Sequence, residues 1–538
     1  MKRSAWADPW LIGLLLLAAA LLLIGLKNGR LWQDEAETAV LGRNVLWYGY
    51  PRAFDGINWV NPALPQQRGY AWTYHTWLPI YLAAGSFYLL GENSFSARLP
   101  FALIGLAAVW LAYRLFRWLT GEIWVARLAV GMMVTSVPFL LHMRQCRYYA
   151  PALFFTLWSV WAYWRFLERE RRPAAGGEAD SASRSRWGGL ELVAALNLLF
   201  HSDHGAFLPV VSALILHLAW SRPTARQIRR GLSVLGLVLA TTVPWMIYLK
   251  AWQHQGSFSW KELSHHLQFY FRQINRFLVP IPFWLVAVIG WRRLFQWAFG
   301  TMGTAQRTAW KLVGLLLGIG LAFLVLVPQQ RHFRYLIFLV PWLLLAQAAL
   351  LACLFRFRRW AAALALTLLL ILTDLIHYSG ASILAARIPA VRARLSSPAV
   401  KIRSLPLEYL TELKRPYRGP MDGVVELLER EGKPGDSVKI PYEELTLIFY
   451  CPWLLVEPLR RQEDFSRETF PDWVILRRDW LPSGFWESPY YRRIKARYRP
   501  IVLDAPDIPW QNRPDPGYHR FKKDTQAPPV VVFRRTQG

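Results

Sequence analysis

Cysteine is scarce in this chain of 538 residues, which contains only Cys146, Cys353 and Cys451. These residues lie far apart and show none of the short spacings that metal sites use. The pattern therefore predicts neither a disulfide framework nor a zinc ribbon. The sequence also shows no clear internal repeat, although many transporters are built from repeated halves.

Acidic residues are few as well, because 35 Asp and Glu oppose 63 Lys and Arg and leave a net charge of +28. In a soluble chain this excess would suggest nucleic acid as a partner. Here many arginines lie in short loops between apolar runs, where anionic lipids and the bias towards basic cytoplasmic loops explain them. We therefore expect membrane lipids and no nucleic acid as partners. The basic groups also suit a lipid-phosphate substrate.

Long apolar runs fill the first 378 residues, and 54% of the chain is hydrophobic. Runs of this length predict a polytopic α-helical membrane protein with about 11–13 transmembrane helices. Aromatic residues, 15% of the chain, fit belts at the two interfaces. The runs are 10–26, 77–90, 99–116, 122–141, 149–166, 188–200, 205–220, 231–250, 277–291, 309–328, 333–353 and 360–378.

The basic loops predict the orientation of the chain. Met1-Lys2-Arg3 precedes the first run, and no clear cleavage site follows it, so we expect an uncleaved signal anchor with a cytoplasmic N-terminus. Arginine-rich loops are expected to be cytoplasmic, which places loop 27–76 and everything after residue 378 outside. This requires that 77–90, only about 20 Å long as a helix, is a juxtamembrane or re-entrant helix that does not cross the membrane. The alternative is one misplaced short helix elsewhere, with 188–200 the weakest. We expect a bacterial inner-membrane location.

The composition changes after residue 378, which predicts two domains: a transmembrane catalytic domain, 1–378, and a soluble extracytoplasmic α/β domain, 379–538. A helical pattern from Met421 to Glu431 stops at a Gly-Lys-Pro-Gly turn. Four short apolar segments predict strands. They are 436–440, 473–476, 500–503 and 530–533.

Charged and aromatic side chains gather at the predicted outer ends of the helices. Asp34, Glu35 and Glu37 directly follow the first run, and acids beside a membrane usually lie in a watery cavity or take part in chemistry. A carboxylate can take a proton from a hydroxyl, and arginine binds phosphate in bidentate fashion. The alternative for each residue is a plain structural role. The acids could be solvated, the arginines could anchor the helices at the interface, and the aromatic residues could belong to the interfacial belts. The other candidates are Asp55, His75, Arg144, Arg147, Tyr149, His201, Arg331, Arg334 and Tyr335.

Several of these residues lie in motifs that resemble a known family. Gln33-Asp34-Glu35-Ala36 is similar to the Asp-Glu signature in the first outer loop of the GT-C glycosyltransferases, in particular the protein O-mannosyltransferase and lipid A aminoarabinose transferase group. The resemblance covers roughly residues 10–350, but Thr76-Trp77 replaces a usual Pro-Pro and Glu37 stands where arginine is frequent. The further matching segments are His75-Thr76-Trp77-Leu78, Ala97-Arg98-Leu99-Pro100, Arg144 to Ala150 and Arg334-Tyr335.

The resemblance implies a sugar transfer from a polyprenyl-phosphate donor to an acceptor hydroxyl or phosphate on the extracytoplasmic side. Asp34, with Glu35, would form the catalytic pair, Asp34 acting as the base, and the anomeric configuration would invert. Arg144, Arg147 and Arg334, with His75, Arg331 and Tyr335, would hold the donor phosphate. Glu37, Asp55, Tyr149 and His201 are the candidates for binding the sugar or the acceptor.

Several alternatives stay open at this stage. A transporter or flippase of an anionic lipid would also need cations in a helix-lined cavity, and a scaffold could use the outer domain to bind a partner. The sequence is compatible with a lipid, a glycan or a protein as the acceptor, and it specifies neither the sugar nor the oligomeric state. The residues predict no resident metal site, although Asp34 and Glu35 could hold a divalent cation such as Mg or Mn.

Overall fold

The computed structural model describes residues 8–60, 70–171, 178–249, 260–280, 303–327, 330–373, 377–378, 402–459, 470–481, 483–509, 511–521 and 526–536. The chain forms two compact units. Unit 1 contains Met1–Ile24, Ala102–Arg144 and Tyr148–Tyr409. Unit 2 contains Gly25–Phe101, Gln145–Arg147 and Leu410–Gly538. The predicted division at residue 378 stays a prediction.

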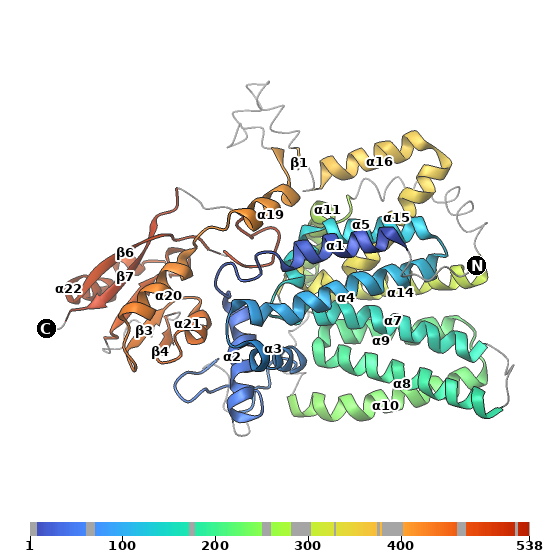
Figure 1. Cartoon of the computed structure of the whole chain (residues 1–538), viewed down its shortest axis with the longest axis horizontal. Helices are drawn as coiled ribbons and strands as arrows, with labels where there is room; N and C mark the ends of the chain where they lie inside the picture. The colour runs from blue at the N-terminus through green and yellow to red at the C-terminus, as the bar shows by residue number, and fades with distance from the viewer. Residues whose placement is uncertain are drawn as a thin grey trace. The chain divides into compact units, whose positions relative to one another are not determined.

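Unit 1 is built from apolar helices that lie side by side, as α7 to α10 show in Figure 1. Local signals set their ends: Asp8 caps α1 by accepting a hydrogen bond from the Trp10 N–H at 3.1 Å, and Asp203 caps α9 in the same way. The elements are α1 (Pro9–Leu23), α4 (Ser94–Thr120), α5 (Ile123–Thr135), α6 (Val137–Met143), α7 (Tyr149–Arg171), α8 (Glu178–Ser202), α9 (His204–Trp220), α10 (Ala225–Leu249), α11 (Trp260–Phe277), α14 (Thr304–Leu326), η3 (Phe333–Leu339), α15 (Val340–Phe357), α16 (Arg359–Leu372), α19 (Leu405–Lys414) and the paired strands β1 (His377–Tyr378) and β2 (Ile402–Arg403).

Four helices of the described residues are long and apolar enough to cross a membrane, or five if the bent pair α5 and α6 is one span. The 66° bend between α5 and α6 lies at Ser136, two residues before Pro138. Shorter apolar helices match the predicted runs 10–26, 188–200 and 205–220. The predicted run 277–291 lies mostly outside the described residues. The chain is thus a membrane protein with several spans, while the total of about 11–13 helices stays a prediction.

Unit 2 begins with two short helices, α2 (Gln33–Tyr48) and α3 (Leu78–Leu90). The 13 residues of α3 agree with the predicted short helix over 77–90. Helix α2 ends at Gly49, whose φ of 80° is the left-handed conformation that glycine adopts without strain. The two helices pack closely at Gly42, where an added Cβ would lie 3.1 Å from the Ala83 Cβ.

The rest of unit 2 is an α/β domain, as predicted, with a mixed sheet in the order β4-β3-β5-β7-β6 (Figure 1). Strands β3, β4 and β5 are parallel, whereas β7 runs antiparallel to both β5 and β6. The predicted helix and all four predicted strands are confirmed. The elements are α20 (Pro420–Glu431), β3 (Ser437–Ile440), α21 (Glu444–Tyr450), β4 (Leu455–Pro458), β5 (Trp473–Leu476), η5 (Arg478–Trp480), η6 (Phe485–Glu487), α22 (Pro489–Arg497), β6 (Tyr498–Pro506) and β7 (Pro529–Arg535).

The loop that contains α2 and Asn58 is fastened to this domain by buried hydrogen bonds. The Arg43 guanidinium of α2 donates to the carbonyl oxygens of Phe449 at 3.1 Å and Ile448 at 3.0 Å, at the end of α21. Asn58 pairs with the backbone of β4, donating to the Leu454 carbonyl and accepting from the Val456 N–H, both at 2.8 Å. Loop and domain therefore form one packed body, and α2 is held from both sides.

The close approach of α2 and α3 gives a stability prediction. Gly42→Ala should lower the free energy of unfolding by about 1–2 kcal/mol, because the new methyl group meets the backbone of α3 and must push it away. Gly85→Ala on α3 is the matched control, since its methyl group would meet nothing within 4 Å and should be neutral or slightly stabilising. Thermal unfolding of the two purified variants compares them. Equal melting temperatures would contradict the tight contact.

Candidate active site

The acidic motif occupies the first turn of α2, where carboxylates are favoured by the positive end of the helix dipole. Asp34 and Glu37 are three residues apart and share one face, whereas Glu35 points in another direction. Asp34 and Glu37 are half-buried, and Glu35 is fully buried. The three acids therefore have different surroundings and different partners.

Glu35 forms a bidentate ion pair with Arg98. Arg98 donates from Nε to Oε1 at 2.8 Å and from its terminal nitrogen to Oε2 at 2.7 Å. The backbone N–H of Cys146 donates to the same Oε1 at 3.0 Å. Both carboxylate oxygens are thus engaged, which offsets the cost of burying the charge.

Arg98 also binds the segment that leads into α2. Its other terminal nitrogen donates to the carbonyl oxygens of Asn28 at 2.8 Å and Leu26 at 3.2 Å. The Glu35–Arg98 pair therefore joins three parts of the chain: the segment before α2, the start of α4 and the turn at 145–147. We interpret Glu35 as a positioning residue.

These contacts also decide whether Asp34 and Glu35 could together bind a divalent cation. The oxygens of Glu35 already accept three hydrogen bonds, so an ion shared by Asp34 and Glu35 does not fit this arrangement. Among the residues that the structure describes, no group of three or more His, Cys, Asp or Glu side chains could hold a metal ion.

Glu37, Arg147 and His75 form a compact cluster beside Asp34. Arg147 donates to Glu37 Oε1 at 2.6 Å and to the Thr38 hydroxyl at 3.1 Å, and its second terminal nitrogen lies 3.1 Å from His75 Nε2. Glu37 Oε1 also lies 3.3 Å from His75 Nε2. Burial alone would raise the pKa of Glu37, but Arg147 and His75 together lower it to about 2.

Burial favours the neutral form of His75 in this cluster. Burial is the largest influence and lowers its pKa, with Arg147 adding to the effect, while the nearby Glu37 and Asp34 carboxylates oppose it only in part. The neutral ring can accept a hydrogen bond at Nε2 from Arg147. The charge of Asp34 acts on His75, so Asp34 belongs to the same cluster.

Asp55 is used within its own loop. Its Oδ1 accepts hydrogen bonds from the N–H groups of Ile57 at 2.9 Å and Asn58 at 2.6 Å, and its Oδ2 lies 3.5 Å from Arg43. These contacts shape the turn before Asn58. They favour a structural role for Asp55 over the predicted role in binding the sugar or acceptor.

The remaining sequence candidates lie in unit 1. Arg144 donates to the Tyr409 hydroxyl at 2.8 Å and to the Leu21 carbonyl at 3.3 Å, so it belongs to a different environment from Arg147. The others form aromatic contacts or are exposed. Tyr149 packs edge-on against Tyr148 with ring centroids 4.6 Å apart, the Arg334 guanidinium carbon lies 5.5 Å from the Tyr335 ring, His201 lies 5.6 Å from Trp245, and Arg331 is exposed before η3.

The structure also adds residues that the sequence reasoning missed. In the sequence Arg98 stands out only as part of a matching segment. An arginine at the start of an apolar run, however, itself indicates a paired or functional charge. The Cys146 backbone N–H gives no sequence signal at all. Trp32, whose indole N–H donates to Gln145 Oε1 at 2.5 Å, further fixes the 145–147 turn beside α2.

Comparison with known proteins agrees with this architecture. Residues 74–248 match the family model for dolichyl-phosphate-mannose-protein mannosyltransferase. The fold resembles ArnT from Cupriavidus metallidurans in two structures, one bound to undecaprenyl phosphate (13% identity, TM-score 0.56) and one in the apo state (14% identity, TM-score 0.53), each covering 98% of both chains.

A weaker likeness connects the chain to the Saccharomyces cerevisiae protein O-mannosyltransferase Pmt1-Pmt2 complex bound to its sugar donor, with 16% identity, a TM-score of 0.35 and coverage of 47% of this chain and 34% of that one. A search among curated proteins finds no match. The family resemblance and the fold class predicted from the sequence are confirmed, and with them the class of membrane glycosyltransferases that use lipid-phosphate-linked sugars.

The buried ion pair gives the first prediction of this site. Arg98→Gln should destabilise the protein by about 3–5 kcal/mol and abolish activity, because it leaves the Glu35 charge buried without its partner. Glu122→Gln is the control, since the Glu122–Arg356 pair is exposed and should contribute about 1 kcal/mol or less. Thermal unfolding in detergent measures both. Similar losses for the two variants would contradict the assigned importance of Glu35–Arg98.

The cluster around Glu37 predicts a pH dependence. Its pKa of about 2 in the folded state lies below the ordinary value of 4.5, so the charged carboxylate stabilises the fold above pH 4.5. This contribution decreases as the pH falls from 4.5 towards 2. We therefore expect the melting temperature of Glu37→Gln to fall less than that of the wild type over this range. Glu426→Gln, in an exposed ion pair, should follow the wild-type curve.

Proposed function

We propose that this chain, a membrane glycosyltransferase of the GT-C type, transfers a sugar from a polyprenyl-phosphate donor to an acceptor hydroxyl, with Asp34 as the base. The observation that carries the proposal is the arrangement on α2. Arg98 holds Glu35 in a bidentate ion pair, and the positive charge of Arg147 balances the charge of Glu37. Asp34 lies half-buried on the same face of α2 as Glu37.

The proposed reaction is a single displacement. Asp34 takes the proton of the acceptor hydroxyl while the hydroxyl oxygen attacks the anomeric carbon from the side opposite the phosphate. A new bond forms between that oxygen and the anomeric carbon, and the bond from this carbon to the phosphate oxygen breaks. The polyprenyl phosphate leaves with the electron pair, so the configuration at the anomeric carbon inverts.

The leaving phosphate needs cations but no proton donor. Because Glu37 already balances the charge of Arg147, we assign Arg147 and His75 mainly to fixing the face of α2 that Asp34 shares with Glu37. Arg144, Arg331 and Arg334, with Tyr335, are proposed as contacts of the donor phosphate on the strength of their motifs. Tyr149 and His201 stay proposed contacts of the sugar or acceptor.

The choice of donor carrier draws on the relatives. The ArnT structure of similar fold holds undecaprenyl phosphate, and the matching family is named for dolichyl-phosphate-mannose. Both carriers are polyprenyl phosphates, which supports the same class of donor here. We place the reaction on the extracytoplasmic side, because the basic loops predict that loop 27–76 is outside.

The base assignment gives a direct test. Asp34→Asn should lower sugar transfer from a panel of undecaprenyl-phosphate sugars by about 100-fold or more, because the amide cannot accept the proton. The melting temperature should change little, since the amide keeps the size of the carboxylate. Asp504→Asn, an exposed acid in the outer domain, is the control and should keep wild-type activity.

Two outcomes would contradict the proposal. Near wild-type transfer by Asp34→Asn would exclude Asp34 as the base. Movement of a labelled polyprenyl phosphate across proteoliposomes, with no glycosylated product from any donor, would instead favour the transporter alternative. Mass spectrometry of co-purifying lipid identifies the carrier in either case.

A further inference from the structure

The first turn of α21, in the C-terminal α/β domain, lies against the start of α2, the helix that carries Asp34. The Leu445 N–H donates to Gln33 Oε1 at 3.3 Å, and the Thr446 hydroxyl donates to the Leu31 carbonyl at 2.9 Å. Tyr442 precedes these contacts in the chain. Burial raises the pKa of Tyr442 well above its usual value, and the negative charge of Asp34 adds to the rise.

The backbone beside Tyr442 is held in a strained conformation. Glu443 has φ of 70° and ψ of 28°, a left-handed geometry that few residues other than glycine adopt. Arg477 is fully buried and donates to the Glu443 carboxylate, to Asp507 Oδ1 at 2.7 Å and to the Ile508 carbonyl at 2.9 Å. Such strain persists where surrounding contacts over-determine it, and it is frequent at functional sites.

This supported loop presents an aromatic pair to a polar cleft. The Tyr442 and Trp480 rings stack with centroids 3.9 Å apart and 16° between their planes. Trp480 lines a cleft of about 560 Å³ together with Arg478, Asp479 and Arg520. An indole face packs well on the C–H face of a sugar ring, and guanidinium groups bind carboxylate or phosphate oxygens.

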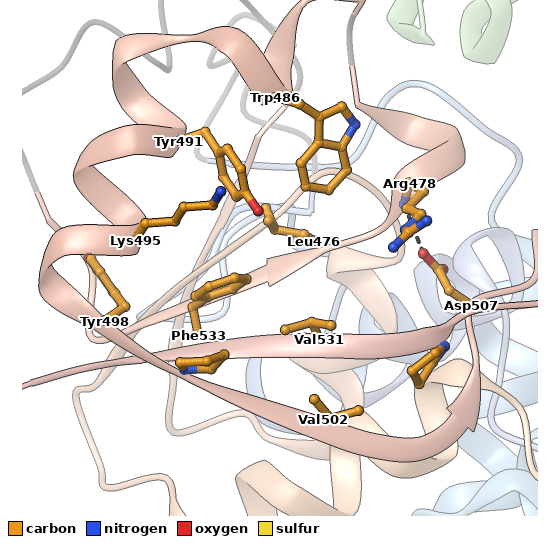
Figure 2. Close-up of a pocket in the computed structure, with 12 residues that line it drawn as sticks. Leu476, Arg478, Trp486, Tyr491, Lys495, Tyr498, Val502, Asp507, Val531 and Phe533 are labelled. Carbon is orange, nitrogen blue, oxygen red and sulfur yellow. Dashed lines mark hydrogen bonds between the residues drawn. The ribbon is translucent and has the colours of Figure 1, made fainter.

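A second cavity of about 360 Å³ adjoins the first, because Arg478 and Asp507 line both. Figure 2 shows Trp486 and Tyr491 on one side of it, with Val531 and Phe533 across from them on the sheet. Lys495, from α22, adds a second cation to this lining. Aromatic rings and positively charged side chains thus line each of the two neighbouring cavities.

From these two neighbouring cavities we infer an acceptor site for an anionic oligosaccharide. This inference rests on the proposed function. One sugar unit would pack on Trp480, with its anionic group on Arg478 or Arg520, and the next would enter the cavity of Trp486 and Tyr491. Tyr442, stacked on Trp480, belongs to the segment that contacts the start of α2 through Leu445 and Thr446. The outer domain would then select the acceptor, while α2 carries the chemistry.

A binding experiment without donor tests this inference separately from the base assignment. The probes are galacturonic acid, its tetramer and neutral maltotetraose, titrated calorimetrically into the full chain in detergent. We expect the galacturonate tetramer to bind at least about tenfold more tightly than maltotetraose. Arg478→Ala should remove most of this difference, because the guanidinium lines both cavities.

Two tryptophan variants distinguish the subsites and serve as controls for each other. Trp480→Ala should weaken binding of the monomer and the tetramer, whereas Trp486→Ala should weaken only the tetramer. Trp480→Phe, which keeps an aromatic face, should restore part of the affinity and shows that loss is not due to misfolding.

Three results would overturn the inference. They are equal affinity for charged and neutral tetramers, wild-type affinity in both tryptophan-to-alanine variants, and tighter binding of dihexanoyl phosphatidic acid at the same residues, which would indicate a lipid headgroup. A loss of transfer in Asp34→Asn with no binding of the charged tetramer would leave the transferase function standing and refute the acceptor site alone.

Discussion

The buried ion pair between Glu35 and Arg98 is the constraint on which the candidate site depends. A carboxylate and a guanidinium at this depth are tolerated only because each is fully hydrogen-bonded. The pair joins residues 63 positions apart and draws in the turn at Cys146. Because these segments are fixed, the direction in which the Asp34 side chain projects from α2 is fixed as well. The same helix is held on its other side by Arg43 and the end of α21.

Four acids between α1 and α3 have different surroundings and therefore suit different roles. Glu35 is a structural anion, Glu37 balances Arg147, and Asp55 shapes a turn. Asp34 shares a face with Glu37 and lies within the electrostatic reach of His75 and Tyr442. Environment rather than residue type thus separates the proposed base, Asp34, from the acids around it, as it does in other enzymes with paired carboxylates.

The sequence predicted what depends on local pattern. Short apolar segments identified β3, β5, β6 and β7, and the Gly-Lys-Pro-Gly stop placed the end of α20. The Asp34 motif was also recognisable. The pairing of Glu35 with Arg98 was not, because it depends on tertiary contacts that no periodicity records. For the same reason the separate surroundings of Arg144 and Arg147, only three residues apart, could not be predicted.

The claim that Asp34 takes a proton, and does not itself attack the sugar, is tested most directly by the stereochemistry of the product. Proton NMR of the first-formed glycoside reports its anomeric configuration relative to the polyprenyl-phosphate donor. A single displacement with Asp34 as base predicts complete inversion. Retention of configuration would mean two displacements through a covalent glycosyl-enzyme, and would contradict the account.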